Sequence, residues 1–98
     1  MDYKVIWSEE AIADLSDICG YIARNDPEAA LRIGNGILDH VRILAEFPFI
    51  GPTYPRGTRG SLREIVFRSY RIFYDVSEEL HQVTVLHVWH GARDEPFI

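Results

Sequence analysis

The segment from residue 47 to residue 60 constrains the fold of this chain more than any other part of the sequence. It contains three prolines and three glycines, namely Pro48, Gly51, Pro52, Pro55, Gly57 and Gly60. Proline removes a backbone donor and glycine weakens helices and strands, so no regular element tolerates such a density. The segment predicts a long loop with different elements before and after it. At 98 residues the chain is expected to be a single domain spanning residues 1–98.

The part before this loop predicts one strand and two helices. Residues 3–7 are rich in β-branched and aromatic side chains and predict a strand that ends at Ser8. Ser8 is the expected N-cap of a helix ending near Asn25. Asp26 followed by Pro27 is a second helix start. The apolar side chains of this second helix share one face: Ala30, Ile33, Ile37, Val41 and Leu44. Because almost no loop separates the two helices, they are expected to form an antiparallel hairpin.

The part after the loop predicts three strands, at residues 62–68, 70–76 and 82–89. A polar turn at residues 77–79 separates the last two, which favours an antiparallel meander. The resulting order is β-α-α-β-β-β. It defines an α+β domain in which the helical hairpin packs on a small antiparallel sheet.

Charge and cysteine content indicate the environment of the protein. The formal net charge is −5, yet residues 53–72 contain five arginines against a single acidic residue, Glu64. Cys19 is the only cysteine, so no intrachain disulfide can form and a reducing cytoplasm is expected. No apolar run approaches the ~20 residues of a membrane span, so no membrane association is expected.

The arginines are the strongest candidates for a functional site. Arg63, Arg68 and Arg71 fall on or beside adjacent predicted strands, and Arg93 follows the last strand, so they are expected to converge on one side of the sheet. Guanidinium groups bind phosphate oxygens in a bidentate manner, which would suit contact with a nucleic acid. The alternative, which we favour on these grounds, is that they pair with carboxylates or contact an acidic segment of another protein.

A metal-independent ribonuclease would need such arginines to stabilise its transition state, and a proton-transfer group besides. His90, Tyr70 and Tyr74 are the available groups. A metal site is not expected, because His87 and His90 are three residues apart on one strand and therefore face opposite ways. No nucleotide-binding glycine motif is present, and no cofactor is expected.

Several short motifs follow one another in an order that resembles the RelE/ParE superfamily of toxins from bacterial type II toxin–antitoxin systems. They are Val5-Ile6-Trp7-Ser8, Asp14-Leu15, Tyr21-Ile22, Pro48-x-x-Gly51, Leu62-Arg63-Glu64, Tyr70-Arg71-Ile72-x-Tyr74 and His90-Gly91-Ala92-Arg93. The resemblance covers nearly the whole chain. It implies a cognate antitoxin as partner, in a hetero-oligomer.

The superfamily divides by mechanism, and the resemblance is closer to its ParE-like branch. RelE-like members cleave mRNA in the ribosomal A site with arginines that Arg71 and Arg93 match by position. They also carry lysines where this chain has Leu62-Arg63-Glu64, and Lys4 is the only lysine here. The resemblance therefore implies a non-enzymatic toxin that poisons DNA gyrase.

Two alternatives stay open beside the ParE-like toxin. The first is a ribosome-dependent mRNA endoribonuclease that uses Arg71, His90 and Arg93. The second is a non-toxic module that binds an antitoxin or acts as a co-repressor.

Overall fold

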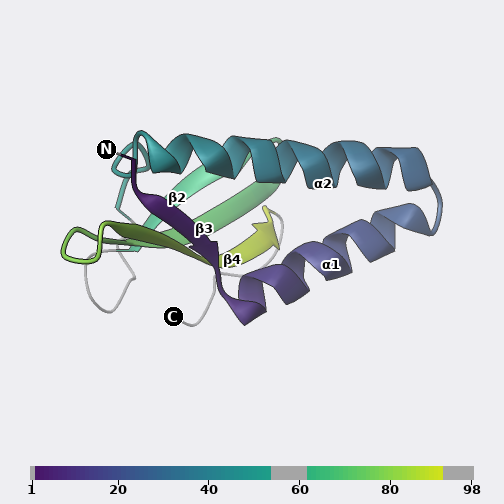
Figure 1. The fold of residues 1–98 in the computed structure, drawn as a ribbon. Helices are drawn as coiled ribbons and strands as arrows, with labels where there is room; N and C mark the ends of the chain where they lie inside the picture. The colour runs from purple at the N-terminus through teal and green to yellow at the C-terminus, as the bar shows by residue number, and fades with distance from the viewer. Residues whose placement is uncertain (1, 54–61, 92–98) are drawn as a thin grey trace.

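The computed structural model describes residues 2–53 and 62–91. In chain order the elements are β1 (Lys4–Trp7), α1 (Glu9–Ala23), α2 (Pro27–Val41), the 3₁₀ helix η1 (Arg42–Ala45), β2 (Leu62–Phe67), β3 (Tyr70–Ser77) and β4 (Gln82–His90). Figure 1 shows the two long helices as a hairpin lying along one face of the sheet. The predicted β-α-α-β-β-β order and α+β class are confirmed.

Both predicted helix caps are present. The Ser8 hydroxyl accepts a hydrogen bond from the Ala11 N–H at 3.0 Å, and the Asp26 carboxylate accepts one from the Ala29 N–H at 3.0 Å. Each cap satisfies a backbone donor that has no partner within the helix. Pro27 takes the first position of α2, where a missing N–H costs nothing. The start of each helix depends only on residues within its first turn, so it could be predicted from the sequence.

The sheet is mixed, with the strand order β1-β4-β3-β2. β2, β3 and β4 form the predicted antiparallel meander, whereas β1 pairs in parallel with β4, with Lys4 opposite Gln82. The chain between these two parallel strands contains the helical hairpin, β2 and β3, which is far longer than the roughly one dozen residues that a parallel connection needs. β2 ends at Phe67, one residue earlier than predicted, because Arg68 adopts a positive φ of 54° in the turn.

The main core lies between the helices and the sheet. It is built from Ala11 of α1, from Ile37, Val41 and Leu44 of α2 and η1, and from Ile72, Tyr74, Val83, Val85 and Val88 of the sheet. A smaller cluster of Leu62, Phe73 and Leu86 lies on the opposite face. Successive side chains of a strand alternate between faces, so Tyr70, Ile72 and Tyr74 face the helices while Arg71 and Phe73 face away.

Candidate functional site

Arg71 lies on the face of the sheet that points away from the helices, where Glu64 holds it. Its Nε is 2.6 Å from the Glu64 Oε2, and its Nη2 is 3.4 Å from Oε1. The two side chains are 23% and 19% exposed. The guanidinium also lies over the ring of buried Phe73, at 5.1 Å from its centre. In this bidentate, partly buried contact, two N–H groups of the Arg71 guanidinium donate to the Glu64 carboxylate of the same chain.

Arg63 lies on the other face of the sheet, one strand away from Arg71. It pairs with Tyr74 across β2 and β3, and its Nη1 donates to the Gly51 carbonyl at 2.7 Å and to the Phe49 carbonyl at 3.3 Å. Its guanidinium is 5.1 Å from the centre of the Phe49 ring. Arg63 therefore ties the segment after η1 to the sheet.

Gly51 is the point at which this segment comes closest to the sheet. Its N–H donates to the Tyr74 hydroxyl at 2.9 Å. A Cβ at this position would lie 2.5 Å from the Glu64 carbonyl oxygen and 2.7 Å from that hydroxyl, so only glycine fits without movement. The next residue, Pro52, accepts a hydrogen bond from the Glu64 N–H at 3.1 Å. The glycine thus lets the segment pair with the start of β2.

The two tyrosines that we considered for proton transfer hold their protons tightly. Burial raises the pKa of Tyr74, although the Gly51 N–H and Arg63 offset part of the rise. Burial also raises the pKa of Tyr70, with a smaller contribution from Cys19. A general base works best with a pKa near the operating pH, so these phenols are poorly tuned for that role.

His90 and Arg68 occupy the end of the sheet where β4 stops and β2 turns into β3. His90 pairs with Tyr70 across the strands, and their rings meet edge to face at 5.4 Å on the helix side. Arg68 lies in the turn with its guanidinium 5.6 Å from the Phe67 ring centre. Arg93 lies outside the described residues.

The expected convergence of the arginines is therefore wrong for the residues that the structure describes. Arg71 faces one side of the sheet, whereas Arg63 and His90 face the other. These residues were assigned from the sequence to the correct strands or to positions beside them. The register between the strands was not predicted, and the register decides which face of the sheet each side chain points to. Glu64 was named from the sequence but was not identified there as the partner of Arg71. It sits on β2 diagonally opposite Arg71.

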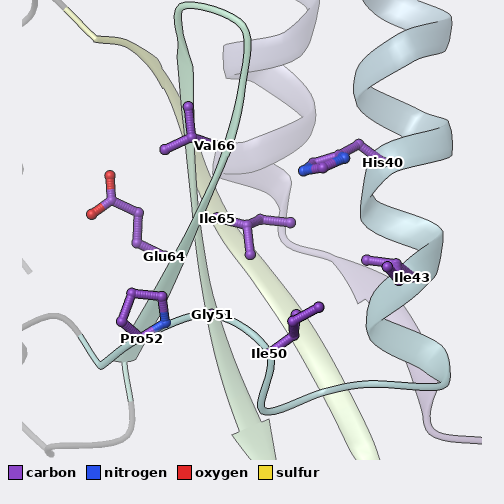
Figure 2. A pocket seen from close by; sticks show the side chains of 8 residues that line it. All are labelled: His40, Ile43, Ile50, Gly51, Pro52, Glu64, Ile65 and Val66. Atoms are coloured by element: carbon purple, nitrogen blue, oxygen red, sulfur yellow. The ribbon is translucent and has the colours of Figure 1, made fainter.

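Two apolar surfaces offer room for a polypeptide partner. The first, which we call the edge hollow, has a volume of about 400 Å³ and is lined by His40, Ile43, Ile50, Gly51, Pro52, Glu64, Ile65 and Val66. Figure 2 shows His40 and Ile43 on the helix side of β2, with Ile65 pointing toward them, and Glu64 and Pro52 on the far side of the strand. β2 is an edge strand, and Val66 is 56% exposed there. The segment at residues 52–53 pairs with the start of this edge, with Thr53 opposite Arg63, and an edge strand accepts an added strand beyond such a pairing.

The second surface, the hairpin groove, lies between α1 and α2 and has a volume of about 670 Å³. It is lined mainly by small and apolar side chains, among them Leu15, Cys19, Ala30, Leu31 and Gly34. Leu31 is 67% exposed. An amphipathic helix buries its apolar face in grooves of this type.

Over the described ranges 2–53 and 62–91, no helix has the length and apolar character to cross a membrane. Within the same ranges, no three metal-binding side chains gather in one place. The described structure thus presents an arginine–glutamate pair and two apolar surfaces on a small α+β scaffold.

The described structure is a small α+β scaffold that carries two apolar surfaces, and comparisons with known proteins identify its family. The family model of the ParE toxin of the type II toxin–antitoxin system parDE matches residues 5–95. The chain belongs to this family, and it is a type II toxin of the ParE/RelE superfamily.

Two relatives agree with this assignment. A Sinorhizobium fredii protein named toxin Y4kP is 35% identical over 86 residues, which cover 86% of each chain. Toxin RelE2 of Caulobacter vibrioides is 35% identical over 91 residues, which cover 92% of this chain and 97% of that protein.

Solved structures share the fold. The chromosomal ParDE system of P. aeruginosa contains a chain that matches with a TM-score of 0.76 at 20% identity, over 90% of this chain and 95% of that one. The RelBE2 toxin–antitoxin complex of Mycobacterium tuberculosis matches with a TM-score of 0.69 at 22% identity, over 92% and 99% of the two chains. The isolated E. coli RelE toxin matches with a TM-score of 0.65 at 22% identity, over 95% and 88%.

Proposed function

We propose that this chain arrests bacterial growth as a ParE-like toxin that poisons DNA gyrase without cleaving RNA, and that a cognate antitoxin neutralises it in the cytoplasm. The observation that carries the proposal is the engagement of Arg71 by Glu64. An arginine that binds a scissile phosphate must turn its donors toward that phosphate, and here the Glu64 carboxylate accepts from the Nε and Nη2 of Arg71. A carboxylate at this position would also repel an incoming phosphate.

The ribonuclease alternative meets a second difficulty. It assigns charge stabilisation to Arg71 and proton transfer to His90, yet the two side chains face opposite sides of the sheet. Transition-state stabilisation and proton transfer must reach the same reacting phosphate. The alternative stays worth testing because a 35% identical relative bears the name RelE2.

The target is tested by pulse labelling of DNA, RNA and protein synthesis within minutes of inducing the chain without an antitoxin. We expect DNA synthesis to fall first, and purified protein to alter supercoiling or cleavage by gyrase. An early fall in protein synthesis with new mRNA 5′ ends would overturn the proposal in favour of the ribonuclease. Normal growth would instead favour the non-toxic binding module.

The antitoxin is proposed to cover the edge hollow and the hairpin groove. Both surfaces are apolar and exposed, and a domain of this size cannot bury all of its apolar surface alone. Val66→Lys would place a charge at the edge hollow, whereas Leu80→Lys makes the same change at a 68% exposed site in the turn between β3 and β4. We expect Val66→Lys to weaken binding of the co-expressed antitoxin and Leu80→Lys to leave it unchanged. Equal affinities would remove the edge hollow from the interface.

A further inference from the structure

A third hollow lies apart from the edge hollow and the hairpin groove, and neither the arginine pair nor the two apolar surfaces use it. It has a volume of about 400 Å³ and lies between α1 and the end of the sheet, where β3 begins and β4 stops. We call it the aromatic hollow. Its lining residues are Asp17, Ile18, Tyr21, Ile22, Tyr70 and His90.

The described lining residues combine three aromatic rings with one carboxylate. Tyr70 and His90 meet edge to face at 5.4 Å, and Tyr21 is 71% exposed at the rim. The faces of aromatic rings attract cations, and guanidinium groups more than most because they are planar and weakly hydrated. Tyr21 already attracts such a group, since the Arg24 guanidinium lies 6.0 Å from its ring centre.

Asp17 restricts the ligand further. Among the described residues it takes part in no ion pair or hydrogen bond of its side chain, unlike Asp14, which accepts from the Val88 N–H at 3.1 Å. A carboxylate beside the rings disfavours an anion. Among the described residues of the lining, Asp17 and His90 are the two metal-binding side chains, and a protein metal site takes three or more such ligands. A cation that also stacks on rings is the ligand that fits.

The negative charge of α1 also favours a cationic ligand. The helix carries Glu9, Glu10, Asp14 and Asp17 and contains no lysine or arginine. Clusters of one sign of charge attract a partner of the opposite sign. Ligand pockets range from about 300 to about 1,000 Å³, so a hollow at the lower end of that range suits one long side chain.

We propose that the aromatic hollow receives an arginine side chain of the polypeptide partner, with its guanidinium stacked on the tyrosine rings and paired with Asp17. The inference rests on the proposed function in taking that partner to be the antitoxin. The arginine in this hollow would add a charged contact to the apolar contacts that the partner makes at the edge hollow and the hairpin groove. Buried arginine anchors contribute strongly to the affinity and selectivity of protein interfaces.

The test uses N-acetyl-arginine amide as a probe, titrated into the whole isotope-labelled chain and followed by two-dimensional amide NMR. We expect saturable shifts centred on Asp17, Tyr21, Tyr70 and His90, and none of comparable size with N-acetyl-norleucine amide. Asp17→Asn should weaken probe binding roughly three- to tenfold. Asp39→Asn, which removes an exposed carboxylate on α2, should leave binding unchanged.

The proposal is overturned if arginine and norleucine probes shift the same amides alike, or if Asp17→Asn and Asp39→Asn bind the probe equally well. A Tyr21→Leu variant gives a second check, because it removes a ring at the exposed rim and keeps an apolar side chain. It should also weaken the arginine probe. These titrations involve neither gyrase nor growth, so their failure is distinguishable from failure of the proposed function.

Discussion

The two faces of the sheet differ in what holds them together, and β3 contributes to both. On the helix side, Ile72 and Tyr74 are fully buried among the apolar side chains of α2 and β4. On the other side, Arg71 and Glu64 form an ion pair beside buried Phe73. Neighbouring residues of a single strand therefore lie in different environments. Candidate residues that are neighbours along a strand point to opposite faces of the sheet, so they cannot act together on one substrate.

The sharpest test of this difference is truncation on each face. Ile72→Ala removes a fully buried side chain and leaves a cavity on the helix side, and is expected to lower the free energy of unfolding by about 2–5 kcal/mol. Val66→Ala on the other face removes an exposed side chain and should cost well under about 1 kcal/mol. Urea unfolding followed by circular dichroism measures both. Similar losses would mean that Ile72 and Val66 do not differ in burial as described.

The next largest effect is expected at Gly51, which joins the loop to the helix-side face. Gly51→Ala would bring a Cβ against the Glu64 carbonyl and the Tyr74 hydroxyl, and the required shift is expected to cost about 1–3 kcal/mol. Gly20→Ala is the matched control, since its Cβ would meet nothing within 4 Å. In the interior of α1 that change should stabilise the protein by about 0.5–1 kcal/mol. Thermal unfolding measures both variants: the midpoint temperature should fall for Gly51→Ala and rise for Gly20→Ala.

A smaller effect is expected from the buried hydroxyl on the helix-side face. Tyr74→Phe removes the partner of the Gly51 N–H and should cost about 0.5–1.5 kcal/mol at pH 7. Burial raises the Tyr74 pKa in the folded chain, so as the pH rises past about 10 the unfolded chain ionises first and the wild type loses stability. The variant lacks this contribution. Urea unfolding from pH 7 to pH 11 should therefore show a shallower alkaline loss in the variant, and parallel curves would contradict the assignment.

The smallest effect is expected for the ion pair on the other face. A double-mutant cycle of Glu64→Ala and Arg71→Ala should give a coupling free energy of about 1 kcal/mol, because the pair is bidentate and only partly exposed. The Asp39 and Arg42 pair on the helical surface is 3.7 Å apart and largely exposed, so its coupling should be smaller. Equal couplings would show that Glu64 does not hold Arg71 more firmly than an ordinary surface contact.

Local patterns allowed much of the fold to be predicted. Ser8 and Asp26 cap the helices as expected, because a cap depends on residues within one turn. The apolar spacing predicted the inner face of α2 and η1: Ala30, Ile37, Val41 and Leu44 are buried, and Ile33 is partly buried against the core. The end of β2 was missed by one residue, since nothing in the sequence signals the positive φ of Arg68.

The candidate site could be predicted only as a list of residues. Arg63 and Arg71 were expected on one side of the sheet, and the observed register places them on opposite sides. The partner of Arg71 was not identified either, because Glu64 reaches it only after β2 pairs with β3. The roles of Arg63, Arg68, Arg71, His90 and Arg93 stay predictions.

By itself, the sequence determined the order of elements, the helix caps and the resemblance to a toxin superfamily, because each depends on residues that are close along the chain or on short motifs in a fixed order. Only the tertiary structure decided that β1 lies parallel to β4, that Glu64 holds Arg71, and that Asp17 shares a hollow with Tyr70. These relations join residues on separate elements. Strand pairing and helix packing set them, and both are properties of the folded chain as a whole.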